Sequence, residues 1–182
     1  MKYSERNETV RAEFLQEIAK IPEESLIYVD ESKTNEVRYL DKEMNREYGR
    51  APRGKPVYGE VRGRKFERTN IIAGKCGDKI VAPGHYKCST DHRLFEAWFS
   101  GALLKEAKPG SVIVLDNATF HRKKTLKKLA ELAHCSVLFL PPYSPDLNPI
   151  ENVWANLKKF LKRHLRDFPS LSLAIAAFFY LV

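Results

Sequence analysis

Two aspartates each follow a short apolar segment of the kind that forms buried strands. Asp30 comes directly after Leu26–Val29. Asp116 comes directly after Val112–Leu115. Ligands gather beyond the carboxyl ends of parallel strands in α/β sheets, so neighbouring strands would bring both carboxylates into one cleft. Carboxylates in contact repel each other unless cations lie between them, and Mg²⁺ typically uses one or two carboxylates plus substrate phosphate oxygens. The pair therefore indicates a divalent-cation site, although a single aspartate at a strand end is more commonly a turn former or a helix cap.

Glu151 is the third candidate, and it has a structural alternative. It follows Asn148 and Pro149 at the start of a predicted helix. Asn148 is a good N-cap, Pro149 suits the first helical position, and a capping box would use the Glu151 carboxylate. Helical spacing also puts Lys158 and Lys162 on the face of Glu151, away from the apolar stripe of the helix. That face suits a metal at its tip and phosphates along its length.

Positive charge is concentrated in three segments. The chain has 31 Lys and Arg against 23 Asp and Glu, which gives a net charge of +8. The clusters are Arg50–Arg68, Arg122–Lys128 and Lys158–Arg166. Any one of them is also typical of a solvated surface, but three in one small domain favour contacts with phosphates. The candidate phosphate contacts are Arg53, Lys55, Arg62, Arg64 and Lys65 in the first cluster, with Lys158 and Lys162 in the third.

Length and composition exclude several classes of protein. The 182 residues suggest one domain, and 43% hydrophobic with 30% charged residues is not the composition of a disordered chain. Three widely spaced cysteines indicate a reducing compartment. Met1–Val10 is polar and unlike a signal peptide, and the most apolar stretch, Ser170–Val182, has 13 residues where a bilayer needs roughly 20. A basic soluble domain with a polyanionic partner remains.

Apolar periodicity predicts the elements that would position these groups. Helices are predicted at Glu8–Lys20, from Ser89 or Thr90 to Ala107, at Lys123–Ala133, at Ile150–Arg166 and at Leu171–Val182. Strands are predicted at Leu26–Val29, Val37–Leu40, Asn70–Ala73, Lys79–Ala82, Val112–Leu115 and Ser136–Leu140, with a Gly-, Pro- and Arg-rich loop at Gly49–Gly63. The early run of strands implies antiparallel pairing and the later alternation with helices implies parallel pairing. The predicted fold is therefore α/β with a mixed sheet.

Three segments carry a resemblance to a known family. They are Val29-Asp30-Glu31-Ser32, the segment from Val114 to His121, and the Pro-rich segment from Leu140 to Trp154. In this order, with 34 residues between Asp116 and Glu151, they resemble the catalytic blocks of mariner-like bacterial insertion-sequence transposases. These enzymes belong to the DDE superfamily of transposases and retroviral-type integrases. The resemblance covers nearly the whole chain from Tyr3 onward.

The resemblance implies a ribonuclease H-like fold, with a mixed five-stranded sheet flanked by helices. It also implies that Asp30, Asp116 and Glu151 are the catalytic, metal-binding triad for two Mg²⁺ or Mn²⁺ ions. Two ions about 3.5 to 4 Å apart can activate the attacking oxygen and stabilise the leaving oxygen of a phosphodiester. Water would first cut the transposon end, and the freed 3′-hydroxyl would then attack target DNA. The residues show no Ser or Cys arrangement that would argue for a covalent intermediate.

Three further residues are candidates to support the triad. Asn117 could orient Asp116 or a metal-bound water. His121 could contact phosphate or scissile DNA, and a structural role is equally consistent with its position. Asn148, the predicted N-cap, lies next to Glu151 in the same helix start. Glu31 and Asp146 are spare carboxylates, Asp146 being interpreted as a turn residue, and Trp154 is predicted to belong to the core.

Residues 1–25 are expected to form a helical lead-in, residues 26–167 the DDE catalytic domain, and residues 168–182 a C-terminal helix. The resemblance implies double-stranded transposon-end and target DNA as partners, a homodimer in the DNA complex and a separate helix-turn-helix portion. The short apolar stretch predicts no membrane contact, and the cysteine usage together with a DNA partner predicts a cytoplasmic, nucleoid-associated location. Two alternatives stay open: a nuclease of the same fold that only hydrolyses DNA, and an inactive DNA-binding remnant.

Overall fold

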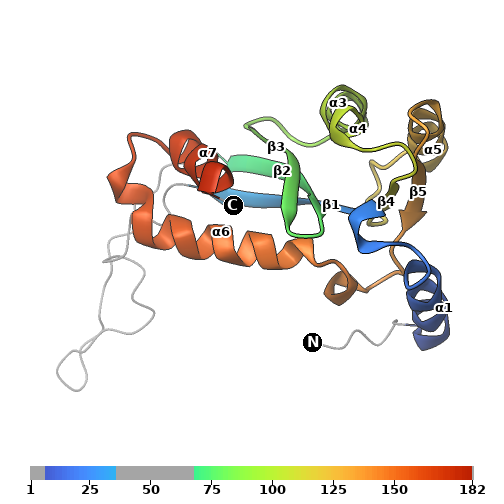
Figure 1. The fold of residues 1–182 in the computed structure, drawn as a ribbon. Helices are drawn as coiled ribbons and strands as arrows, with labels where there is room; N and C mark the ends of the chain where they lie inside the picture. Colours follow the sequence, from blue (N-terminus) through green and yellow to red (C-terminus); the bar gives the residue numbers. More distant parts are fainter. Residues whose placement is uncertain (1–6, 36–67, 182) are drawn as a thin grey trace, which may run out of the picture.

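A mixed five-stranded sheet forms the centre of the structure, a computed structural model that describes residues 7–35 and 68–181 (Figure 1). The strands are β1 (Leu26–Asn35), β2 (Arg68–Cys76), β3 (Lys79–Tyr86), β4 (Val112–Leu115) and β5 (Ser136–Phe139), in the spatial order β3-β2-β1-β4-β5. The β1–β2 and β2–β3 pairs are antiparallel, whereas the β1–β4 and β4–β5 pairs are parallel. The mixed α/β sheet expected from the sequence is therefore confirmed.

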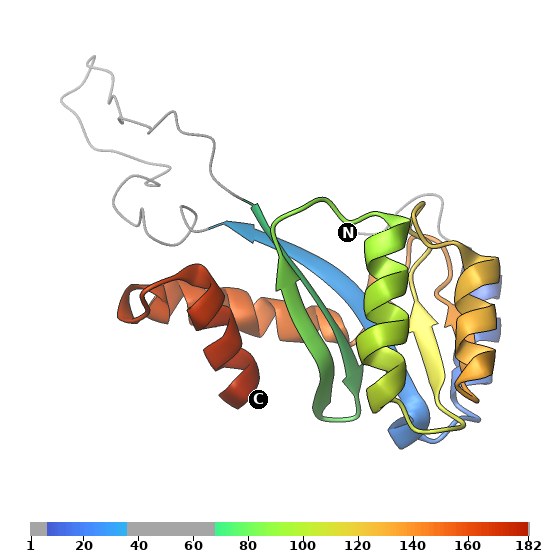
Figure 2. The ribbon, with the colours of Figure 1, turned by 90° about the horizontal axis from the view of Figure 1, so that it is seen from above.

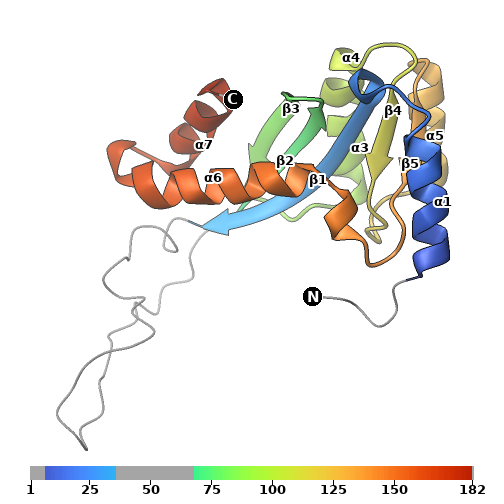
Figure 3. The same cartoon turned by 60° about the horizontal axis from the view of Figure 1, so that its bottom comes forward.

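Helices cover both faces of this sheet. They are α1 (Glu8–Ile18), α3 (His92–Trp98), α4 (Leu104–Glu106), α5 (Lys123–Leu132), α6 (Ile150–His164) and α7 (Leu171–Leu181), with a π-helical turn at Phe99–Leu103 between α3 and α4. Figure 2 shows α3 and α5 side by side over one face, with α6 on the other. In Figure 3, α6 runs across β1, while α1 lies next to β5.

The two faces of β1 belong to different cores because successive side chains of a strand point to opposite sides. Ile27 and Val29 are buried in the core that α3 and α5 cover. Leu26 packs with Phe14 of α1 on the other face. A third core joins α6 and α7 to Ile71 and Ala73 of β2. Both ends of the described chain are thus packed against the sheet that carries the candidate aspartates.

Two differences from the predicted elements concern the site and its surroundings. β1 does not end at Val29 but continues to Asn35, because Asp30–Asn35 pair with β2 in an antiparallel ladder. Helix α3 is capped by Asp91, whose side chain accepts a hydrogen bond from the Leu94 N–H, and not by Ser89 or Thr90. The predicted strand Val37–Leu40 and loop Gly49–Gly63 lie outside the described residues.

None of the helices within residues 7–35 and 68–181 is long and apolar enough to cross a bilayer.

Candidate active site

Asp30 and Asp116 occupy equivalent positions on neighbouring strands. The last parallel pair between β1 and β4 joins Tyr28 to Val114. Asp30 lies two residues after Tyr28, and Asp116 lies two residues after Val114. Since alternate residues of a strand share a face, the β1 and β4 backbones direct both side chains to the same side of the sheet. The sequence expectation that two strands would bring these carboxylates to one edge is met, although Asp30 lies inside β1 and not at its end.

A pocket of about 290 Å³ lies at this edge of the sheet. Asp30, Asp116 and Glu151 all line it. The remaining walls come from the segments that follow β4 and β5: Asn117, Ala118, Leu140, Pro141, Pro142, Tyr143, Ser144, Pro145 and Asn148. The structure therefore brings the three acidic residues together, and their catalytic and metal-binding roles stay predictions.

Asp30 is held by a side chain of α6. The indole Nε1 of Trp154 donates a hydrogen bond to Asp30 Oδ2 over 2.9 Å. Burial, together with repulsion from Glu31 and Glu151, raises the pKa of Asp30 to about 7, and the Trp154 hydrogen bond only partly opposes this rise. Asp30 is thus a carboxyl group whose charged form is costly without a nearby cation.

Asp116 is held by donors from the segment that follows it. Its Oδ1 accepts a hydrogen bond from the Ala118 N–H at 2.9 Å and lies 3.1 Å from His121 Nδ1. Burial alone would raise the pKa of Asp116, but the His121 and Ala118 hydrogen bonds outweigh it and lower the pKa. Asp116 is therefore a carboxylate whose charged form the protein itself stabilises.

His121 is buried behind Asp116 and does not face the pocket. Burial opposes its charged form, but the hydrogen bond with Asp116 and the attraction of Glu31 outweigh that effect and raise its pKa to about 9. Its Nε2 lies 3.5 Å from Glu31 Oε1, which is longer than a normal hydrogen bond, so the contact is electrostatic. The predicted contact of His121 with phosphate is not supported by this buried position, whereas its contact with Asp116 is direct.

Glu151 opens helix α6 with an exposed side chain. The Asn148 side chain accepts a hydrogen bond from the Ile150 N–H at 3.4 Å, so Asn148 does help to cap the helix. In a capping box the Glu151 carboxylate would accept a hydrogen bond from the Asn148 N–H. That N–H donates instead to the Pro145 carbonyl at 2.9 Å. The alternative interpretation of Glu151 as a capping-box residue is therefore wrong.

Two asparagines tie the strand ends around the pocket. Asn117 donates from Nδ2 to the Leu140 carbonyl at 2.5 Å and accepts from Lys123 Nζ at 2.5 Å, so its amide joins the segments after β4 and β5. Asn148 donates from Nδ2 to the Val29 carbonyl at 3.4 Å, directly before Asp30. Both side chains position backbone segments of the pocket, and the predicted role of Asn117 toward a metal-bound water stays a prediction.

An ion pair anchors the Pro-rich segment to the first helix. The Arg11 guanidinium donates to both carboxylate oxygens of Asp146, at 3.2 Å and 2.7 Å. The Arg11 side chain is only 6% exposed, whereas that of Asp146 is 50% exposed. Asp146 belongs to the 3₁₀ turn Pro145–Leu147, so its interpretation as a turn residue is confirmed. Its ion pair with Arg11 also fastens this turn to α1.

The three acidic residues of the pocket have the ligand chemistry that a divalent cation prefers, but their side chains are not close enough together to share one. Hard cations prefer carboxylate oxygens, and the pKa of Asp30 is raised first by burial and then by the negative charges of Glu31 and Glu151, all of which a bound cation would offset. Yet within residues 7–35 and 68–181, no three His, Cys, Asp or Glu side chains lie close enough together to hold one metal ion. Joint binding by Asp30, Asp116 and Glu151 thus requires a side-chain movement, for which the exposed Glu151 has room.

The basic residues predicted to bind phosphate divide into two groups. Lys158 and Lys162 are exposed on α6, on the turns that follow Glu151. The other five lie outside the described residues: Arg53, Lys55, Arg62, Arg64 and Lys65.

Sequence reasoning missed three partners of the site. Trp154 was correctly expected in the core, at 1% exposure, but its hydrogen bond to Asp30 was not foreseen. The sequence pattern indicates only a spare carboxylate at Glu31 and gives no signal for Arg11. A usable signal existed for Trp154, because residues three apart in a helix are neighbours, so Trp154 lies where the apolar stripe borders the face of Glu151. The Arg11–Asp146 contact spans 135 residues and left no local signal.

Comparison with known proteins gives the family. The DDE superfamily endonuclease family matches residues 25–172 of the chain. A 57-residue segment is 35% identical to the Transposable element Tc3 transposase of Caenorhabditis elegans, which is 31% of this chain and 17% of that protein.

Solved structures with the same fold include two complexes of the mariner transposase Mos1. The paired end complex with Mg superposes with a TM-score of 0.65 at 16% identity, over 88% of this chain and 51% of that one. The Strand Transfer Complex superposes with a TM-score of 0.62 at 19% identity, over 84% of this chain and 46% of that one. The shared fold confirms the ribonuclease H-like architecture. The chain spans about half the length of these Mos1 chains and less of Tc3.

Proposed function

Because the chain belongs to the DDE superfamily endonuclease family, we propose that it is the catalytic domain of a DNA transposase. The domain, which we assign to residues 26–167, would cut the ends of a transposon and join them to target DNA. The observation that carries this proposal is the shared pocket of Asp30, Asp116 and Glu151, which are supplied by β1, the end of β4 and the first turn of α6.

Asp30, Asp116 and Glu151 would hold the metal, which we propose to be two Mg²⁺ or Mn²⁺ ions. When bound, such ions stabilise the charge that develops on the attacking and leaving oxygens of a phosphodiester. The paired-end Mos1 structure is described with Mg, which supports a divalent ion for this fold. Trp154 orients the Asp30 carboxylate and His121 orients that of Asp116, so the protein presents both groups without ordering them anew during the reaction.

DNA is the substrate and the main partner in this proposal. Lys158 and Lys162 lie exposed on α6, on the turns after Glu151, and would contact phosphates beside the pocket. Neutralising DNA phosphates there would make affinity fall as salt concentration rises. Mos1 is described in paired-end and strand-transfer complexes, which supports DNA as the partner of this fold. We propose that this chain acts on DNA as a homodimer, with a helix-turn-helix portion recognising the ends, at the bacterial nucleoid in the cytoplasm.

A strand-transfer assay tests this function most directly. The chain would be incubated with Mn²⁺, a supercoiled target plasmid and a labelled duplex that carries a pre-cut end of the element. Covalent joining of the label to the plasmid is the expected result. Nicking of the plasmid without joining would instead show a nuclease that only hydrolyses DNA. DNA binding without either product, in wild type and Asp116→Asn alike, would show an inactive remnant.

A further inference from the structure

The parallel ladder does not reach the two aspartates. It ends at Tyr28 and Val114, two residues before Asp30 and Asp116, so backbone pairing between β1 and β4 leaves their separation open. Asp116 is also 44% exposed in its side chain, and packing alone does not fix its rotamer. Any accurate spacing of the two carboxylates must therefore come from side-chain contacts.

One such contact reaches Asp116 from behind. Oδ1 accepts the Ala118 N–H and faces His121 Nδ1 at 3.1 Å, so the donors of the protein gather on one oxygen. The His121 side chain is only 2% exposed. The centroid of its ring lies 4.2 Å from that of Phe95 and 4.5 Å from that of Phe120, and this packing restricts the orientation of the imidazole.

The opposite ring nitrogen of His121 meets a second buried atom. Nε2 lies 3.5 Å from Oε1 of Glu31, whose side chain is 11% exposed. Both atoms are buried, and among the described residues neither has a hydrogen-bond partner. An unpaired buried polar atom is costly, and here a complementary pair faces each other at a distance that a small movement would close.

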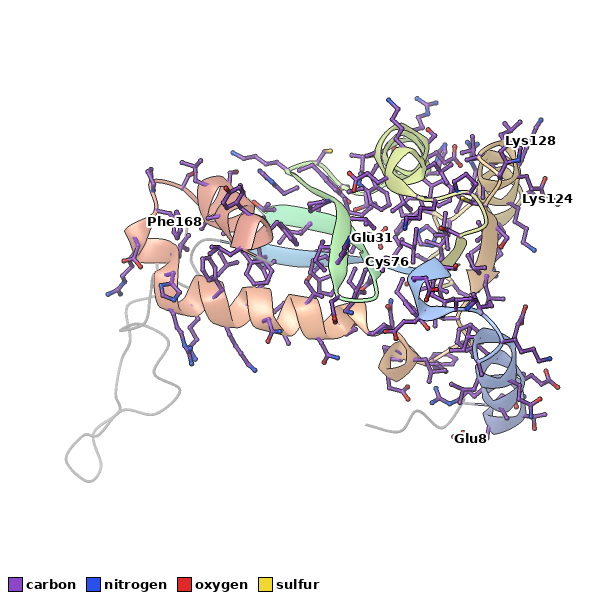
Figure 4. The ribbon with its side chains drawn as sticks, in the orientation of Figure 1. Glu8, Glu31, Cys76, Lys124, Lys128 and Phe168 are labelled. Atoms are coloured by element: carbon purple, nitrogen blue, oxygen red, sulfur yellow. The ribbon has the colours of Figure 1, made fainter. Side chains whose placement is uncertain are left out.

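Glu31 connects this contact to the other aspartate. It follows Asp30 in β1, so the two side chains lie on opposite faces of the strand. In Figure 4, Glu31 lies on the α3 side of the sheet, with α6 on the other side. A side-chain path thus runs from Asp116 through His121 to Glu31, beside Asp30, across the gap where backbone pairing has ended.

We propose that Glu31 is a positioning residue of the active site, which fixes the Asp116 carboxylate relative to Asp30 through the imidazole ring of His121. This rests on the proposed function, in which both aspartates bind the cation. The reach of the Glu31 side chain matters in this arrangement as well as its charge, because Oε1 must meet a ring nitrogen whose position Phe95 and Phe120 restrict.

Mn²⁺ affinity without DNA tests the proposal. Calorimetric titration would compare the wild-type chain with Glu31→Gln, Glu31→Asp, His121→Gln and the double variant Glu31→Gln/His121→Gln. Residues that orient metal ligands typically change affinity by 10- to 100-fold, so we expect each single variant to bind Mn²⁺ about tenfold more weakly. The double variant should be no weaker than His121→Gln alone, because Glu31 acts through that ring. Glu131→Gln, an exposed glutamate on α5, is the matched control and should bind as wild type does.

Urea unfolding in metal-free buffer separates this role from a merely structural one. A loss of stability in Glu31→Gln with unchanged Mn²⁺ affinity would overturn the proposal, as would additive losses in the double variant. Should Glu31→Gln fail to fold, Glu31→Asp carries the same comparison with the charge retained. If the wild-type chain binds no Mn²⁺ at all, the proposed metal site is wrong and this inference fails with it. If the Glu31 variants bind Mn²⁺ as tightly as wild type does, only the role of Glu31 is wrong.

Discussion

Trp154 Nε1 donates a hydrogen bond of 2.9 Å to Asp30 Oδ2, across 124 residues of sequence. Trp154 is 1% exposed and belongs to the core between α6 and the sheet. It lies one helical turn after Glu151, so a single helix supplies one acidic residue of the pocket and fixes another. Trp154 therefore contributes both to the core and to the orientation of Asp30, and substitutions that affect only one of these roles can tell them apart.

Trp154→Phe should reduce metal-dependent DNA nicking by about tenfold, since it removes a donor that orients a proposed ligand. The same change should lower the free energy of unfolding by about 1–3 kcal/mol, through the lost hydrogen bond and the smaller ring. Trp98→Phe is the matched control, because Trp98 Nε1 donates over the same 2.9 Å to the Ala82 carbonyl. It should lose stability and keep nicking activity. Equal nicking by both variants would contradict the role of Trp154.

Asp116→Asn keeps the shape of the side chain and removes one negative charge from the pocket. Nicking in Mg²⁺ or Mn²⁺ should fall by several orders of magnitude, and EDTA should abolish wild-type nicking. DNA affinity should hold or rise slightly, because a carboxylate that faces phosphates is repulsive. Asp78→Asn, in the exposed turn between β2 and β3, serves as the control. Normal nicking by Asp116→Asn on a pre-cut end would refute the metal site.

Glu151→Gln separates catalysis from helix capping. Its carboxylate is exposed, and the Asn148 N–H that a capping box would use already donates to the Pro145 carbonyl. The free energy of unfolding should therefore change by no more than about 0.5 kcal/mol. Nicking should nevertheless fall as strongly as in Asp116→Asn. Nicking close to the wild-type rate by this folded variant would remove Glu151 from the site.

Asp146→Asn should release the Pro-rich segment from α1. It replaces a two-bond ion pair with a single weak hydrogen bond and leaves the buried Arg11 guanidinium undercompensated. Because Asp146 is half exposed, we expect a loss of about 1–3 kcal/mol in urea unfolding, below the cost of breaking a fully buried pair. Faster amide hydrogen exchange at Leu147 and Asn148, whose N–H groups donate within this turn, would report the loosening. Glu13→Gln, exposed on α1, should change neither measurement.

The acid stability of the chain should depend on Glu96 and Arg122, which join α3 to the start of α5. The hydrogen bond from Arg122 lowers the pKa of Glu96 below its ordinary value of 4.5. A lowered carboxyl pKa contributes stability above the unfolded value, and that contribution is lost as pH falls through the folded pKa. Arg122→Gln should therefore unfold at less urea than wild type at pH 7, and the difference should shrink below pH 4.5. A difference that grew with acidity would contradict this assignment.

Local pattern alone predicted much of the site. The apolar segment before Asp116 predicted a buried strand that ends at Leu115, and the structure has β4 there. The stripe of α6, with Pro149 before it, predicted a helix that begins at Ile150, and its exposed face carries Glu151, Lys158 and Lys162 as expected. Periodicity and end signals are properties of a few neighbouring residues, so one sequence suffices to read them.

Contacts between distant segments were decided only by the tertiary structure. β1 continues past Asp30 because Asp30–Asn35 pair with β2, more than 30 residues later in the chain, and composition does not encode that register. The hydrogen bond of Trp154 to Asp30, the ion pair of Arg11 with Asp146, and the approach of His121 to Glu31 depend in the same way on strand order and helix placement. The sequence determined which chemical groups the pocket contains, whereas the packing of strands and helices determined which side chains hold them, because such contacts form only once remote segments are brought together.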